Sequence, residues 1–167
     1  QQSASLKCLR VVFGRFMALV SDVADETARP DTLQVIFLDI DGVLNRTAAA
    51  THIRLDDDLV ALFKDLIDRS GAYIVLSTYW RRFGDYISYI LARYGISPQR
   101  ILGRTPGAGH LQGECYDEAV YRDRSAEICS WLEDHPEVTN FVVLDDRPSA
   151  GLGSLAPHFV HCRSELG

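Results

Sequence analysis

Short apolar runs alternate with amphipathic stretches along the chain from Leu33 to the C-terminus. The runs are continuous, which is typical of strands that are covered on both faces of a parallel sheet. The pattern predicts five strands, at Val35–Asp39, Tyr73–Ser77, Arg100–Leu102, Phe141–Asp145 and His158–Cys162.

Three stretches with apolar residues at helical spacing lie between these strands and predict helices. The first ends at Gly71 and the second at Gly95, while the third ends before Pro136 and is expected to be capped by Asp123 or Ser125. Strands that alternate with helices predict an α/β fold with a central parallel sheet of about five strands. The apolar stripes are Leu55, Leu59, Leu62, Phe63, Leu66 and Ile67; Ile87, Ile90, Leu91 and Tyr94; and Ile128, Trp131 and Leu132.

Residues 1–33 precede the alternating pattern and differ from it in charge. From Gln1 to Ser21 the chain has basic residues and no acidic one, and its apolar residues recur at helical spacing. We expect an amphipathic helix that packs on the domain or on a protein partner, followed by a polar linker. A remnant of an organelle-targeting (mitochondrial) segment is the alternative. The predicted organisation is a helix and linker at 1–33 and one α/β domain at 34–167.

The composition excludes several classes of protein. An apolar fraction of 47% excludes a disordered chain, and a net charge of −6 argues against broad nonspecific nucleic-acid binding. No apolar run approaches the roughly 20 residues that span a bilayer, so no membrane association is expected. The cysteines Cys8, Cys115, Cys129 and Cys162 form no CxxC pair, which indicates reduced thiols in an intracellular protein, cytoplasmic by default.

Polar side chains gather at the carboxyl ends of three predicted strands. The first strand ends in Asp39-Ile40-Asp41-Gly42, the second in Ser77-Thr78 and the fourth in Asp145-Asp146. A single Asp at a strand end is common because turns favour it, but two acid pairs and a hydroxyl pair are not explained in that way. Ligands of a parallel sheet bind beyond the carboxyl ends of its strands, so we expect one shared site there.

The acids at these ends predict a bound cation. Two carboxylates about 4 Å apart repel by about 4 kcal/mol at an effective dielectric constant of about 20. Either some of Asp39, Asp41 and Asp145 hold a proton, or a cation lies among them. Oxygen ligands select a hard cation, and phosphate chemistry favours Mg²⁺.

The same residue types suit phosphoryl chemistry. A carboxylate can attack phosphorus and form an acyl phosphate, and a cation offsets the repulsion between the two anions. A second acid can protonate the leaving oxygen and then activate water. Asp39 and Asp41 would lie on the same side of an extended chain and could approach one substrate together.

These motifs resemble those of the haloacid dehalogenase-like (HAD) superfamily, most of whose members are magnesium-dependent phosphatases that act through an aspartyl-phosphate. The run VIFLDIDGVLN at 35–45 resembles motif I. The resemblance implies a three-layer Rossmann-like sandwich, with Asp39 as the nucleophile and Asp41 as the general acid/base whose backbone carbonyl binds the metal. The implied site comprises catalytic Asp39, Asp41, Ser77 and Arg124, substrate-binding Gly42, Thr78 and Arg81, and metal-binding Asp39, Asp41, Asp145 and Asp146.

The motif III cation of this superfamily is a lone Lys or Arg. Arg124 is the predicted residue because it opens the third helix before the fourth strand, and Arg122 is the alternative.

The segments FLDIDGVLN, IVLSTYWR, RSAEICSWL and FVVLDD, in that order, resemble the HAD domain of "Swiss Army Knife" RNA-repair proteins. In that branch Arg81 would face the substrate phosphate or a nucleic-acid backbone. The chain departs from the branch at Thr78-Tyr79, where small serines are usual, and at Arg147, where an acid is usual. Both departures bear on the identity of the substrate.

The spacing of the motifs leaves no room for a cap domain. Between Thr78 and Arg124 the chain can hold one helix, one short strand and a Gly-rich loop at 103–114, which is too short to fold as a domain. An uncapped site admits large substrates, so we expect a phosphorylated macromolecule, either a nucleic-acid end or a phosphoprotein. Two alternatives stay open: a catalytically idle HAD fold within a larger assembly, and phosphoryl transfer to an acceptor other than water.

Other conspicuous residues have structural interpretations. Trp80 and Trp131 are expected to pack in the core rather than stack on bases. Asp56-Asp57-Asp58 is expected to cap and charge a helix N-terminus rather than bind metal.

Overall fold

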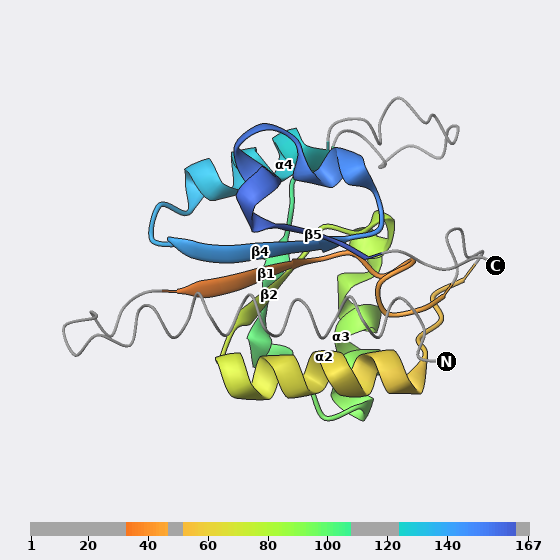
Figure 1. The fold of residues 1–167 in the computed structure, drawn as a ribbon. Helices are drawn as coiled ribbons and strands as arrows, with labels where there is room; N and C mark the ends of the chain where they lie inside the picture. Colours follow the sequence, from red (N-terminus) through yellow and green to blue (C-terminus); the bar gives the residue numbers. More distant parts are fainter. Residues whose placement is uncertain (1–32, 47–51, 108–123, 163–167) are drawn as a thin grey trace.

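The computed structural model describes residues 33–46, 52–107 and 124–162 (Figure 1). Five parallel strands form one sheet in the order β3-β2-β1-β4-β5. This arrangement confirms the predicted α/β fold and all five strands, whose ends differ from the predicted ones by two residues at most. The strands are β1 (Gln34–Leu38), β2 (Tyr73–Leu76), β3 (Ile101–Arg104), β4 (Asn140–Asp145) and β5 (Phe159–His161).

Helices cover both faces of the sheet and produce three layers (Figure 1). Helices α2 (Asp57–Ser70) and α3 (Gly84–Arg93) lie on one face. Helix α4 (Arg124–Asp134) lies on the other, beside the 3₁₀ helices η4 (Pro148–Gly151) and η5 (Gly153–His158).

Successive residues of β1 point to opposite layers, as their period of two requires. Ile36 and Leu38 belong to the apolar cluster that contains α2 and α3. Val35 and Phe37 belong to the cluster that contains α4, where the Trp131 ring packs edge-on against Phe37 with 5.4 Å between centroids. All four residues are fully buried, which explains why the strand reads as a continuous apolar run.

Glycine ends the first helix as predicted. Gly71 adopts a left-handed conformation with φ of 67°, and its N–H donates to the carbonyl of Ile67. At the third helix one of the two proposed caps is wrong, because α4 begins at Arg124 and Ser125 therefore lies inside its first turn. The other proposed cap, Asp123, lies outside the described residues.

The register brings three strand ends level with one another. Leu38 pairs with both Leu76 and Leu144. The ladders then continue by one residue, because Asp39 N–H donates to the carbonyl of Leu144 and Ser77 N–H donates to the carbonyl of Leu38. Asp39 is thus placed between the ends of β2 and β4.

Several predictions fall outside the described residues: the N-terminal helix and linker up to residue 32, the loop from residue 108, Arg122, and the thiols Cys8 and Cys115. Within the described ranges no cap domain interrupts the sheet, and no helix is long and apolar enough to cross a membrane. Cys129 is half-buried, and Cys162 is buried with its Sγ donating to the carbonyl of Val160.

Candidate active site

Three carboxylates converge at the carboxyl edge of the sheet, where the ends of β1, β2 and β4 lie side by side. Asp39 follows β1, Asp145 ends β4, and Asp146 comes next in the chain. Each offers an oxygen atom that lies within 4.8 Å of the others. Asp39 and Asp145 are buried, at 3% and 0% exposure, so water can screen their charges only weakly.

Arg124 supplies positive charge to this cluster from the first residue of α4. Its Nη1 lies 3.0 Å from Oδ2 of Asp39 and also donates a hydrogen bond to Oδ2 of Asp145. The side chain is only 3% exposed. Burial lowers the pKa of Arg124, but the charges of Asp39 and Asp145 outweigh that effect and raise the pKa above its usual range. The structure therefore places the predicted motif III residue against the predicted nucleophile.

One arginine does not balance all the acids. Burial, followed by the nearby charge of Asp39, raises the pKa of Asp145 to about 7 against the opposing effect of Arg124. The same two causes raise the pKa of Asp146 to about 6, while Arg147 acts in the opposite direction. The acids thus favour either protons or a further cation among them.

Gly42 makes room for Asp146. It adopts a φ of 75°, and a Cβ atom built on it would lie 2.6 Å from Cβ and Oδ2 of Asp146. Any other residue would meet both a strained backbone and a clash with this carboxylate. The structure thus gives Gly42 a steric role beside an acid of the three-carboxylate cluster, and its expected contact with substrate stays a prediction.

Asp41 does not join the three-carboxylate cluster in the described structure. The strand ends at Leu38, and a turn follows in which the N–H groups of Val43 and Leu44 donate to the carbonyl of Ile40. The turn begins at Asp41, and the expectation that Asp39 and Asp41 approach one substrate together stays a prediction. The charge of Asp41 acts on the cluster, because it contributes to the raised pKa of Asp146.

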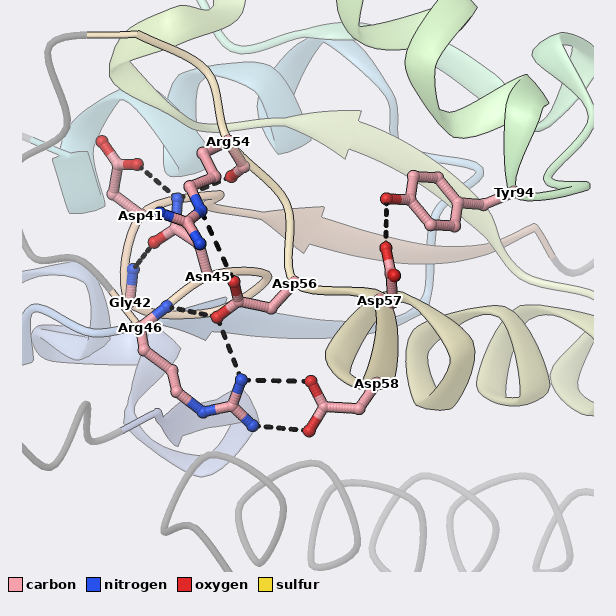
Figure 2. Close-up of polar contacts among 9 residues, drawn as sticks. All are labelled: Asp41, Gly42, Asn45, Arg46, Arg54, Asp56, Asp57, Asp58 and Tyr94. Atoms are coloured by element: carbon pink, nitrogen blue, oxygen red, sulfur yellow. Dashed lines mark hydrogen bonds and ion pairs between the residues drawn. The ribbon is translucent and has the colours of Figure 1, made fainter.

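The turn fixes the Asp41 carboxylate by both of its oxygen atoms. Asn45 Nδ2 donates to Oδ1 over 2.8 Å, and the indole Nε1 of Trp80 donates to Oδ2 over 2.9 Å. Figure 2 shows Asn45 between Asp41, Gly42 and Arg54: Asn45 Oδ1 accepts from Gly42 N–H, and Nδ2 also donates to the carbonyl of Arg54.

An ion-pair network attaches the end of this turn to helix α2 (Figure 2). The Arg46 guanidinium donates to Asp56 and Asp58, and Arg46 N–H donates to Asp56 Oδ2. Asp56 is the N-cap residue of α2, but its side chain makes no cap hydrogen bond. The acidic run thus charges the helix N-terminus as expected, while Asp56 accepts from Arg46 instead of capping.

The motif II residues lie beside Asp39 and differ in their hydrogen bonding. Ser77 is fully buried, and its Oγ has no hydrogen-bond partner among the described residues. Thr78 is also buried, and its Oγ1 accepts from the N–H of Trp80 at the start of the 3₁₀ helix η1 (Tyr79–Phe83). The Ser77 hydroxyl can therefore donate a hydrogen bond to a ligand, which would remove the cost of a buried donor without a partner.

The Arg81 side chain is held in an ion pair with α4. It pairs with Glu127 of α4 at 2.9 Å and donates to the carbonyl of Thr78. Gly107 packs on it so closely that an added Cβ would lie 1.8 Å from Nη2. Arg81 joins η1 to α4, and its predicted contact with substrate stays a prediction.

Sequence reasoning missed three residues of this region. Trp80 is buried in the core as expected, but its indole also binds Asp41, a contact that spacing does not reveal. Asn45 carried a signal as the last residue of the motif I run. Thr105, directly after β3, is 2% exposed with an Oγ1 that lacks a partner among the described residues, which resembles the situation of Ser77.

The carboxylates fit a magnesium ion by the chemistry of their donor atoms. Asp39, Asp145 and Asp146 offer only oxygen ligands, as Mg²⁺ prefers. Burial, followed by the nearby charge of Asp39, raises the pKa values of Asp145 and Asp146, so a bound cation would stabilise their ionised forms. These three are the residues that would hold the ion.

A family model described as the HAD domain in Swiss Army Knife RNA repair proteins matches residues 35–167. No curated protein and no solved structure matches the chain. The matched residues include all but the first residue of the sheet, the turn with Asp41, the buried Arg124 and the acids at the end of β4. The chain belongs to the HAD domain family of Swiss Army Knife RNA repair proteins.

Proposed function

We propose that this chain is a Mg²⁺-dependent phosphomonoesterase that acts through an aspartyl-phosphate on Asp39. The observation that carries the proposal is the cluster of Asp39, Asp145 and Asp146, in which buried Asp39 and Asp145 share one ion-paired arginine, Arg124. A cluster of this kind does not by itself stabilise the folded state, because unbalanced buried charge is unfavourable. It suits a site that receives a cation and a phosphate together.

Two residues supply the covalent and proton-transfer chemistry. An oxygen of Asp39 attacks phosphorus, the bond from phosphorus to the leaving oxygen breaks, and Asp41 gives that oxygen a proton. Asp41 then takes a proton from water as the water oxygen attacks the phosphorus of the aspartyl-phosphate. This second step releases inorganic phosphate and restores Asp39.

Other groups hold the phosphoryl oxygens. The Ser77 hydroxyl can donate to one of them, since it is buried and has no partner among the described residues. Arg124 beside Asp39 stabilises negative charge that develops during attack. A bound Mg²⁺ would supply charge neutralisation between the nucleophile and the phosphate, held by Asp39, Asp145 and Asp146.

The substrate class that we propose is the phosphorylated end of a nucleic acid. Arg82 and Arg104 flank the motif II turn, and neither forms an ion pair with a described residue. Both line two adjoining hollows of about 570 and 390 Å³. The Arg82 guanidinium also lies 4.7 Å from the ring centre of Phe83, which is 41% exposed. Exposed cations beside an aromatic ring suit phosphates and bases, and the family is described from RNA repair proteins.

Hydrolysis of four substrates tests the proposal: an aryl phosphate, a 5′-phosphorylated oligonucleotide, a 3′-phosphorylated oligonucleotide and a phosphopeptide. We expect Mg²⁺-dependent release of phosphate that is lost in Asp39→Asn. Arg82→Glu should raise KM for the oligonucleotides and leave the aryl phosphate unaffected, while Arg93→Glu, an exposed arginine at the end of α3, serves as the matched control. Activity that survives Asp39→Asn would refute the mechanism, and preference for the phosphopeptide would refute the substrate class.

A further inference from the structure

Two hydrogen bonds restrict the orientation of the Asp41 carboxylate. Both of its oxygens accept hydrogen bonds from neutral donors, Asn45 at 2.8 Å and Trp80 at 2.9 Å. A solvated Asp side chain samples several rotamers, but two donors on opposite oxygens select one orientation.

Each donor is itself fixed by its surroundings. Asn45 is 0% exposed and bonds Gly42 N–H and the carbonyl of Arg54 in addition to Asp41 (Figure 2). Trp80 is 9% exposed and packs in the apolar cluster beneath the sheet, and its backbone N–H donates to Thr78. Because Asn45 and Trp80 are themselves held in place, their hydrogen bonds keep the Asp41 carboxylate in one orientation.

The chemistry of the donors defines what they can do. An indole N–H and an amide NH₂ donate hydrogen bonds but cannot take a proton from a carboxyl group. Neither donor can therefore take a proton from Asp41. Each carboxylate oxygen accepts one hydrogen bond from these donors and has a second lone pair, which can take part in proton transfer with substrate or water.

We propose that Trp80 and Asn45 are positioning residues that orient Asp41 for proton transfer to the leaving oxygen. Trp80 has a second consequence, because it lies in η1 directly after Ser77 and Thr78. Its hydrogen bond joins the acid on the β1 turn to the phosphate-binding turn after β2. The proton donor and the phosphate ligand are thereby kept at a fixed separation. This inference rests on the proposed function.

Trp80→Phe tests the proposal, because it removes the indole N–H and keeps an aromatic ring in the core. Trp131→Phe is the matched control: Trp131 is buried at 6% exposure in the opposite apolar cluster. The substrates are an aryl phosphate, whose phenolate leaves without a proton, and an alkyl phosphate, whose alkoxide needs one. The measured quantity is kcat/KM, which reports the steps up to departure of the leaving group.

We expect Trp80→Phe to lower the ratio of alkyl to aryl kcat/KM by about tenfold, since positioned acid catalysis is worth about 10²- to 10⁴-fold. Asn45→Ala, which frees the other oxygen, should lower the ratio in the same direction, and Trp131→Phe should leave it unchanged. Equal losses for both substrates in Trp80→Phe would mean that Trp80 acts through packing alone, and the proposal would be overturned.

A second measurement separates this inference from the proposed activity. The chain has two tryptophans, so a proton–nitrogen NMR spectrum contains two indole signals, and Trp80→Phe identifies the signal of Trp80. Asp41→Ala should shift that signal and speed its exchange with solvent, and should leave the Trp131 signal in place. An unmoved Trp80 signal would overturn the contact whether or not the chain hydrolyses phosphates. Absence of activity in the wild type, with a shifted signal, would instead overturn the proposed function and with it the role in proton transfer.

Discussion

Replacing Arg124 with methionine should have opposite effects on the fold and on metal binding. Arg124 contacts Asp39 at 3.0 Å and also contacts Asp145, and all three side chains are 5% exposed or less. Methionine keeps the unbranched apolar stem and removes the charge. The two carboxylates would then face each other in the interior without a counter-ion.

The cost can be estimated from these distances. One pair of unit charges at 3.0 Å attracts by about 5 kcal/mol at an effective dielectric constant of about 20. Removing one partner of a buried pair typically costs about 3–5 kcal/mol. We expect Arg124→Met to lower the free energy of unfolding by that amount in Mg²⁺-free buffer at a pH of about 8. The loss should be smaller at a pH of about 5, because Asp145 can then hold a proton.

Magnesium should compensate for part of this loss. The variant retains Asp39, Asp145 and Asp146 without a competing cation, so Mg²⁺ should bind it more tightly than it binds the wild type. Hydrolysis should nevertheless fall steeply, because the charge that stabilises the attacked phosphate is gone.

Urea denaturation with and without Mg²⁺, at both pH values, measures these effects. Arg69→Met is the matched control, because Arg69 pairs with Asp65 on the exposed face of α2 and should contribute less than about 1 kcal/mol. A Mg²⁺-free Arg124→Met variant as stable as the wild type at the higher pH would refute the reasoning. It would mean that Arg124 does not balance buried negative charge.

Three further predictions concern the same edge of the sheet. The pKa values of Asp145 and Asp146 are raised to about 7 and about 6 from 3.8, so the stability that their protonation contributes is complete below about pH 4 and is lost as the pH rises through 6 to 7. Thermal denaturation should therefore show a larger stabilisation by Mg²⁺ above pH 7 than below pH 5, and an equal effect at both would contradict the raised pKa values. Gly42→Ala should weaken Mg²⁺ binding in a calorimetric titration, because the added Cβ meets Asp146. Gly153→Ala is the control: Gly153 has a φ of 61° and nothing within 4 Å, so this variant should lower the free energy of unfolding by about 1–2 kcal/mol and leave Mg²⁺ binding unchanged. Ser77→Ala should leave stability unchanged or raise it and should weaken binding of a phosphate mimic such as vanadate, since the buried hydroxyl has no partner among the described residues; a clear loss of stability would contradict this account.

The amino-acid pattern was sufficient for the fold and for the acids that meet at the strand ends. Apolar runs covered on both faces read as strands without ambiguity, and the parallel arrangement followed from the helices between them. Motif I and the acids after β4 could be assigned because short polar runs at strand ends stand out against apolar strands. Arg124 could also be predicted, because its position at the start of a helix before β4 is a property of chain order.

Contacts between residues far apart in the chain could not be predicted from the sequence. A turn begins at Asp41, and the hydrogen bonds that shape it, from Val43 and Leu44 N–H to the carbonyl of Ile40, could not be derived from the amino-acid pattern. The hydrogen bond between Trp80 and Asp41 joins residues 39 positions apart, and Trp80 looks like an ordinary core residue in the chain.

The sequence by itself therefore determined which side chains are available and which strand each one follows, because both depend on local periodicity. The tertiary structure decided how they are oriented and charged, because register, burial and long-range hydrogen bonds act between elements. It placed the cation of Arg124 against Asp39 and Asp145, left Ser77 without a partner among the described residues, and fixed Asp41 by both oxygens.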